Sequence, residues 1–244
     1  MSDAALAELQ SGLRHIAENS MGVVPTHSLF DARSIREVMR NRVITIAFDN
    51  DKPVAFTAMV YIPYAGSAVL HLGLTMIATS HRGIRLQSPI FTKCLVMPMF
   101  NMRRLSYYIT NIAASPAGIG AVSDYFIDTF PTYREDSKCT DVHLAIARYV
   151  LKHYRSEFAC SERATFNERT FVVHGSNEPD GGGAPEFMKE DGNPVSFYKD
   201  ERCNEFCRRR LDYTAGDEQF QVAKVDFVMT SVKYLASIAS KRRH

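Results

Sequence analysis

AVLHLGLTMIATSHRGIRLQSPIFTKCL, residues 68–95, predicts a strand, a polar turn and an amphipathic helix in direct succession. The turn contains Arg82 followed by Gly83. The first N–H groups of a helix have no partner inside the helix, so a turn that leads into a helix can hold an anion such as a phosphate. We therefore expect an anion-binding cradle at this turn.

The regions on either side of this stretch predict an ordered series of elements. Helices are expected at 3–19 and 28–41, followed by strands at 43–49, 54–62 and 69–77 that form an antiparallel meander. The helix behind the turn is expected to stop near Met97, because Pro98 follows. A strand at 105–113 and a helix at 115–128 come next, and Gly118 and Gly120 indicate a close approach of backbone to another group.

The remaining part of the chain predicts further elements of both kinds. Helices are expected at 141–158, 200–211 and 229–240, and strands at 170–174 and 218–228. Between them, residues 175–193 hold five glycines and two prolines, which is typical of a loop.

Composition limits the class of protein. The 244 residues are 45% hydrophobic, which suits one large domain, and a net charge of +2 gives no reason to expect a nucleic-acid or membrane partner. No segment approaches the roughly 20 apolar residues of a membrane span. Five irregularly spaced cysteines argue against a disulfide framework, so we expect a cytoplasmic protein. Cys203 and Cys207 share a helix face, but a zinc site needs about four ligands, so no metal is expected.

The order of elements and two motifs resemble the GCN5-related N-acetyltransferase (GNAT) superfamily. That family's phosphate loop follows the pattern [Arg/Gln]-x-x-Gly-x-[Gly/Ala], and here Arg82-Gly83 fits, whereas Arg85 and Gln87 stand where small residues are usual. Independently, the family often places Tyr-x-x-x-Gly-Phe at the end of the helix after the fifth strand. Here Tyr125–Phe130 keeps the tyrosine and phenylalanine, with Thr129 in place of glycine.

The resemblance implies an α/β fold with a mixed, mostly antiparallel central sheet flanked by helices. We expect one domain over residues 1–244, with an acyl-CoA-binding core at 1–131. Residues 132–244 would add the last strands and the acceptor region.

The resemblance also implies acyl-CoA, such as acetyl-CoA, as co-substrate, bound between the fourth and fifth strands. Pantetheine amides would pair with an open strand edge, as an added peptide strand does. An N–H near Ile77 would stabilise the oxyanion that forms on the thioester. The residues expected to bind the donor are Met76, Ile77, Ala78, Arg82, Gly83, Ile84, Arg85, Leu86, Gln87 and Asn111.

The expected reaction is direct attack of an acceptor amine on the thioester. The resemblance assigns Tyr125 as the general acid for the leaving thiolate, and an unperturbed tyrosine is protonated at neutral pH. His71 is one candidate for the base and a chain of water molecules is another. A structural role for His71 is the alternative reading.

Other classes of function stay open. A phosphate loop without its glycines also suits an N-acyl synthase that takes its acyl group from an acyl carrier protein. Such a synthase would dock the carrier on a basic face near Arg82, Arg85 and Lys93. A non-catalytic binding module on the same scaffold is a third hypothesis. The acceptor is expected to be an amine-bearing small molecule or peptide, and a homodimer is compatible with the sequence.

Overall fold

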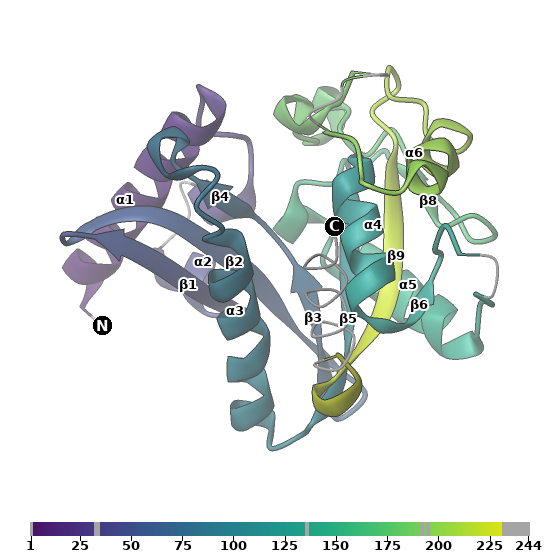
Figure 1. Ribbon diagram of the computed structural model, residues 1–244, viewed down its shortest axis with the longest axis horizontal. Helices are drawn as coiled ribbons and strands as arrows, with labels where there is room; N and C mark the ends of the chain where they lie inside the picture. Colours follow the sequence, from purple (N-terminus) through teal and green to yellow (C-terminus); the bar gives the residue numbers. More distant parts are fainter. Residues whose placement is uncertain (1, 32–34, 135–136, 191–192, 194–195, 231–244) are drawn as a thin grey trace, which may run out of the picture. The chain divides into compact units, whose positions relative to one another are not determined.

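The computed structural model describes residues 2–31, 35–134, 137–190, 193 and 196–230. The chain divides into two compact units (Figure 1). Unit 1 comprises Met1–Arg103 and Glu157–Ala159, and unit 2 comprises Arg104–Ser156 and Cys160–His244. The boundary expected at residue 131 falls inside unit 2.

The strands of unit 1 form the expected antiparallel meander. They are β1 (Arg42–Asp49), β2 (Lys52–Tyr64), β3 (Ser67–Leu72) and β4 (Thr75–Ile77). The long strand β2 pairs with β1 on one side and with β3 and then β4 on the other. The single strand expected at 69–77 is thus interrupted at Gly73, where a Cβ atom would overlap the carbonyl oxygen of Ala58.

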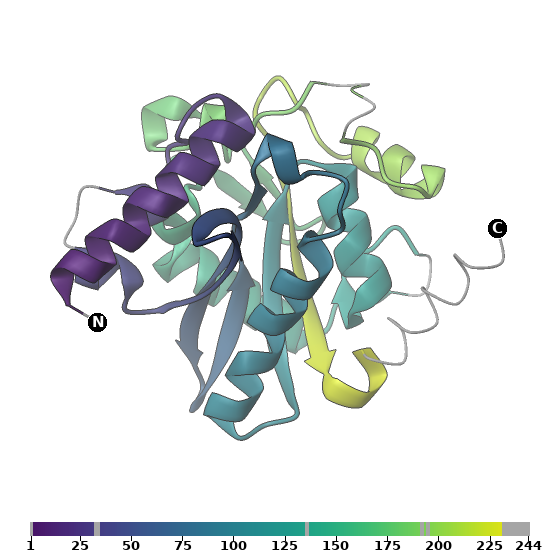
Figure 2. The same ribbon diagram turned by 60° about the vertical axis from the view of Figure 1, so that its left-hand side comes forward.

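Helices cover the sheet of unit 1. Helix α1 (Asp3–Met21) packs on β2 and β4, and α3 (Gln87–Met102) packs on β1 and β2; Figure 2 shows both helices at full length. Seven consecutive residues of β2, from Val54 to Val60, are buried. Because successive side chains of a strand point to opposite faces, both faces of β2 must be covered.

Two helix predictions for unit 1 are wrong in extent. The helix expected at 28–41 is a 3₁₀ turn at Ser28–Phe30 and a short helix α2 at Ile35–Met39. The helix expected to stop at Pro98 continues to Met102. Pro98 costs the helix one N–H, but it is buried in the core, so packing outweighs the lost hydrogen bond.

Unit 2 is built around its last strand. Strand β9 (Glu218–Asp226) pairs antiparallel with β5 (Ser106–Ala113), with β6 (Ile127–Phe130) and with β8 (Val172–His174), and β8 pairs with β7 (Thr165–Asn167). The helices are α4 (Pro116–Tyr125), α5 (Asp141–His153) and α6 (Glu201–Arg208). The predicted α/β class with antiparallel strands and flanking helices is confirmed.

Sequence patterns missed two strands of unit 2. The helix expected at 115–128 ends at Tyr125 because the next residues form β6, which pairs with β9. Strand β7 has three residues, too few for a periodic pattern. Helices α5 and α6 are shorter than expected, and the helix expected at 229–240 lies outside the described residues from 231 onward.

A buried ion pair attaches the segment Glu157–Ala159 to the rest of unit 1. The Nη2 atom of Arg42 lies 2.7 Å from Oε2 of Glu157, and the Arg42 side chain is only 1% exposed. The hydroxyl of Ser28 donates to the carbonyl oxygen of Glu157 at 2.5 Å. This pair is the principal polar tie that we identify for the segment.

Replacing Glu157 with alanine should lower the free energy of unfolding by about 3 kcal/mol, because it leaves a buried guanidinium without its counter-ion. The matched control is Glu168→Ala, which breaks an exposed pair with Arg148 and should cost no more than about 1 kcal/mol. Urea unfolding of both variants measures the difference. Equal losses would contradict the assigned role of burial.

Candidate functional site

Strand β4 leaves one backbone edge available within unit 1. In the described part of this unit, β4 pairs only with β2. The carbonyl oxygen of Leu74 accepts a bond from β2 at 2.8 Å, the N–H of Ala78 donates one at 2.9 Å, and Met76 lies in register between them. Because residues of an antiparallel strand alternate in direction, Thr75 and Ile77 point their N–H and C=O groups away from β2.

The turn after β4 is held against the end of α1. Both the N–H and the hydroxyl of Thr79 donate to Oδ1 of Asn19 at 2.9 Å. The guanidinium of Arg82 donates to the carbonyl oxygen of Ser20 at 2.5 Å and to its hydroxyl at 3.1 Å. Arg82 therefore fixes the position of the turn, and its cation lies where a helix C-terminus favours positive charge.

The turn itself has the geometry of an anion-binding nest. Gly83 has φ 83° and Arg85 has φ 63°, and the next residue, Leu86, is right-handed helical with φ −64° and ψ −28°. Alternation of left- and right-handed residues makes successive N–H groups converge. No side chain caps the N-terminus of α3 at Leu86, and residues 82–85 are exposed. The predicted cradle residues Arg82–Gln87 are thus brought together at one exposed turn.

Arg85 adopts a backbone conformation that suits glycine. A left-handed φ costs a residue with a Cβ atom roughly 1–2 kcal/mol. Glycine adopts such a φ without this cost, and the family pattern that the sequence resembles has glycine at this position. The exposed Arg85 side chain adds a positive charge beside the nest.

The structure favours a structural role for His71. Its side chain on β3 is fully buried and its ring stacks on Phe158, with 4.2 Å between ring centroids. Burial, and to a lesser extent the charge of Arg42, lowers the pKa of His71 to about 3, so the ring is neutral at neutral pH. A role as catalytic base stays a prediction without geometric support.

The other predicted site residues lie in unit 2. Asn111 on β5 is buried and donates from Nδ2 to Oε1 of Gln221 at 3.1 Å. Tyr125 is the last residue of α4, is half-buried, and lies within electrostatic reach of Tyr198. The residues from Met76 to Gln87 that are predicted to bind the donor belong to unit 1, so the predicted site residues are divided between the two units.

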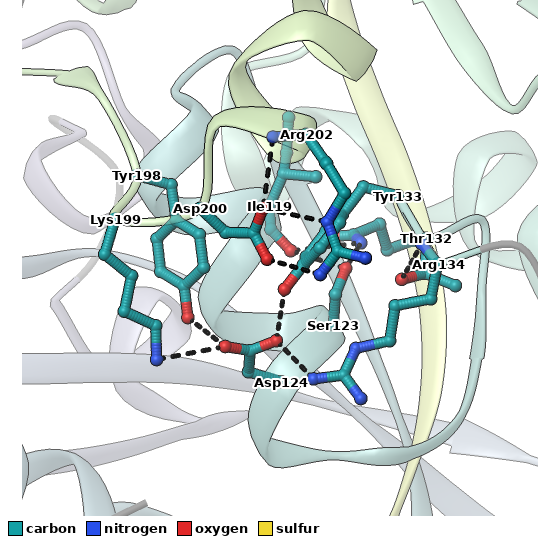
Figure 3. Close-up of polar contacts among 11 residues, drawn as sticks. Ile119, Ser123, Asp124, Thr132, Tyr133, Arg134, Tyr198, Lys199, Asp200 and Arg202 are labelled. Carbon is teal, nitrogen blue, oxygen red and sulfur yellow. Dashed lines mark hydrogen bonds and ion pairs between the residues drawn. The ribbon is translucent and has the colours of Figure 1, made fainter. Parts of the chain in front are cut away.

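A carboxylate next to Tyr125 collects four donors from two other segments of unit 2 (Figure 3). Oδ1 of Asp124 accepts from the hydroxyl of Tyr133 at 2.6 Å and from the guanidinium of Arg134 at 2.7 Å. Oδ2 accepts from the hydroxyl of Tyr198 at 2.6 Å and lies 3.2 Å from Nζ of Lys199. We call these five residues the Asp124 cluster.

The Asp124 cluster has shifted pKa values. Burial alone would raise the pKa of Asp124, but the hydrogen bonds from its four partners lower it to about 2. Burial, and then the hydrogen bond to Asp124, raises the pKa of Tyr133 and of Tyr198. At neutral pH the cluster therefore holds one carboxylate, two neutral phenols and two cations.

The close approach predicted at Gly120 is confirmed. A Cβ atom at Gly120 would overlap the ring of Tyr198, so the missing side chain lets Tyr198 lie against α4 and reach Asp124. No pattern in the sequence indicates the Asp124 cluster itself, because Tyr133 and Tyr198 lie 9 and 74 residues from Asp124 and share no motif with it.

The described part of the chain contains neither a candidate metal site nor a candidate membrane-spanning helix. No three side chains of His, Cys, Asp or Glu there are grouped so that they could hold a metal ion. Among the same residues, no helix has the length and apolar character needed to cross a membrane.

Comparisons with known proteins find acetyltransferases among solved structures. No family model and no curated protein matches the chain. An aminoglycoside 6'-N-acetyltransferase from Enterococcus faecium is 16% identical over 50% of this chain and 60% of its own, with a TM-score of 0.32. A ribosomal-protein-alanine N-acetyltransferase from Brucella melitensis is 12% identical over 43% and 72%, with a TM-score of 0.30.

A third solved structure is the PaiA N-acetyltransferase of Thermoplasma acidophilum in complex with coenzyme A. It is 12% identical over 45% of this chain and 75% of its own, with a TM-score of 0.28. The chain spans only 57–66% of three aminoglycoside acetyltransferases. These solved structures to which the chain is similar are acetyltransferases. A similarity of this extent does not assign an activity or a substrate to the chain.

Replacing Arg85 with glycine should raise the free energy of unfolding by up to about 1 kcal/mol, because it removes the left-handed strain at a small entropic cost. Ile84→Gly is the matched control at the neighbouring exposed position, whose φ is not positive, and should lower stability by about 0.5–1 kcal/mol. Urea unfolding gives both values. A loss of stability in Arg85→Gly would count against the nest.

Replacing Asp124 with asparagine should lower stability by about 1–2 kcal/mol at pH 7, after allowance for solvent screening of its partners. Because folding lowers the pKa of Asp124, its contribution is complete above the unfolded value near 4 and is lost as pH falls toward 2. The difference between variant and wild type should therefore shrink below pH 4.

The control for this titration is Asp180→Asn, which removes an exposed partner of Arg163 and should change stability little at any pH. Chemical unfolding at pH 7, 4 and 3 tests both variants. A difference in free energy of unfolding between Asp124→Asn and wild type that does not change with pH would show that the lowered pKa contributes no stability.

Proposed function

We propose that this protein is an N-acyltransferase that transfers an acyl group from a coenzyme A thioester to the amine of an acceptor. One observation carries the proposal: the outward backbone edge of β4 is followed, after a 3₁₀ turn at Thr79–His81, by an exposed turn whose N–H groups converge at the uncapped start of α3. A strand edge suits the amides of pantetheine, and a nest of N–H groups suits its phosphates.

The backbone of β4 supplies the groups that the thioester requires. Thr75 and Ile77 offer outward N–H groups, one to pair with a pantetheine amide and one to stabilise the oxyanion that forms when an amine attacks. Arg85 and the N–H groups of the turn bind the pyrophosphate. Arg82 holds the turn in place through its bonds to Ser20.

The chemical step needs no covalent enzyme intermediate. The amine nitrogen bonds to the carbonyl carbon, the carbon–sulfur bond breaks, and the thiolate takes a proton. We assign that proton to Tyr125, following the family resemblance. The proton that the amine loses goes to water and not to His71, because the ring of His71 is fully buried.

Donor binding is tested by thermal unfolding with acetyl-CoA, a longer acyl-CoA, free coenzyme A and ATP. A ligand that binds only the folded state stabilises it by ~2.7 kcal/mol at a hundredfold excess over its Kd. We expect a shift with the coenzyme A thioesters that exceeds the shift with ATP. The absence of any shift with a thioester would reject the proposal.

Turnover is tested with Tyr125→Phe. Loss of a general acid should lower kcat by about 10²–10⁴-fold and leave the thermal shift with acyl-CoA unchanged. Tyr149→Phe is the control, because Tyr149 is a half-buried tyrosine of α5 that contacts His153 and Tyr154 instead of the Asp124 cluster. Normal turnover in Tyr125→Phe would remove Tyr125 from the mechanism. If acyl-CoA raises the melting temperature of the wild-type protein but no acyl transfer is observed, a non-catalytic binding module is favoured.

A further inference from the structure

A long segment of this chain carries positive charge and no negative charge. No Asp or Glu occurs between Asp51 and Asp124, and this interval contains the cradle turn and all of α3. The Lys and Arg residues of the interval are Lys52, Arg82, Arg85, Lys93, Arg103 and Arg104. The turn and α3 therefore carry lysine and arginine but no carboxylate of their own, although Asp49 of β1 lies 3.2 Å from Nε2 of His81, just before the turn.

The cations of this surface are available for a partner. Arg85, Lys93 and Arg103 are exposed, and we find no carboxylate paired with any of them among the described residues. Arg82 differs, because its guanidinium is bound to Ser20. Charges that are not neutralised within a surface attract an oppositely charged partner and steer its approach.

Helix α3 also exposes large apolar side chains. The residues that it buries against the sheet are Ile90, Cys94, Leu95, Pro98 and Met99. On the opposite side, Lys93, Met97 and Phe100 follow one another at helical spacings of four and three, so they share one face. Met97 is 45% exposed and Phe100 is 77% exposed. A helix that is apolar on both sides is usually covered on both sides.

Coenzyme A would not cover this face. Phe100 comes 13 residues after Gln87, the first residue of α3, which corresponds to about 20 Å along the helix. A nucleotide with its phosphates at the start of α3 has no need of apolar groups that far away.

We infer that the exposed face of α3, defined by Lys93, Met97, Phe100 and Arg103, docks an acidic protein that presents its acyl group on a phosphopantetheine arm. The inference rests on the proposed function and names the partner of the same donor site. Such an arm carries the pantetheine and phosphate that β4 and the turn are proposed to bind. The protein that bears the arm must then lie beside the turn, where α3 offers cations and apolar side chains.

The experiment compares two donors and two variants. Acyl transfer is measured with acyl-CoA and with the same acyl group on a purified acidic acyl carrier protein. Binding of the unloaded phosphopantetheinylated carrier is titrated directly by calorimetry. The variants are Lys93→Glu with Arg103→Glu, and Met97→Ser with Phe100→Ser. Neither pair includes a residue of the cradle.

We expect each double variant to weaken carrier binding and carrier-dependent transfer about tenfold or more, while transfer from acyl-CoA stays within about twofold of wild type. Carrier binding by the wild type should also weaken as salt rises. Arg169→Glu, an exposed charge reversal in unit 2, should change neither donor's rate. Circular dichroism and melting temperature confirm that each variant folds.

Three results would overturn the inference. They are no binding of the carrier by the wild type, binding that both double variants retain, and preferential sedimentation with phosphatidylserine vesicles in place of carrier binding. A dimer that the Met97/Phe100 variant dissociates would instead assign the face to a second copy of the chain. Carrier binding is titrated without catalysis, so failure of the proposed function, seen as no transfer from either donor, is a separate outcome.

Discussion

The backbone pairing of β2 determines the arrangement of unit 1. Its 13 residues pair with β1 along one edge and with β3 and β4 along the other, and its middle is buried on both faces. The interruption at Gly73 ends β3 and lets the chain resume pairing as β4. That register decides which backbone groups of Thr75 and Ile77 point outward, so the proposed donor edge follows from hydrogen bonding and not from side chains.

Burial separates structural polar groups from groups that could act on a ligand. His71 is enclosed and neutral, and Arg42 is enclosed and paired with Glu157, so both contribute to the interior of unit 1. The turn from Arg82 to Arg85, by contrast, is exposed and ends at a helix without a side-chain cap. A binding site for a large anionic ligand must be exposed, because its backbone N–H groups have to exchange hydrogen bonds with water for hydrogen bonds with phosphate oxygens.

The two units differ in the polar groups that they present. Unit 1 presents the exposed turn from Arg82 to Arg85, to which we assign the phosphates of the proposed donor. Unit 2 places Tyr125 beside a carboxylate that binds two phenols, a guanidinium and an ammonium. Asp124 holds Tyr133, Arg134, Tyr198 and Lys199 against the end of α4, and helix ends otherwise fray. The turn that carries Tyr125 is thereby kept in a defined position.

The sequence by itself determined the meander and the close approach at Gly120, because each depends on local periodicity or on one small residue. The α/β class followed from the family resemblance, and the anion-binding role of the turn stays a prediction. The sequence could not predict β6, the burial of His71 or the Asp124 cluster. The strand β6 pairs with β9 residues that lie more than 90 positions further along the chain. The Asp124 cluster joins side chains from segments that no motif connects. Such contacts depend on which elements pack together, and that is decided by tertiary structure.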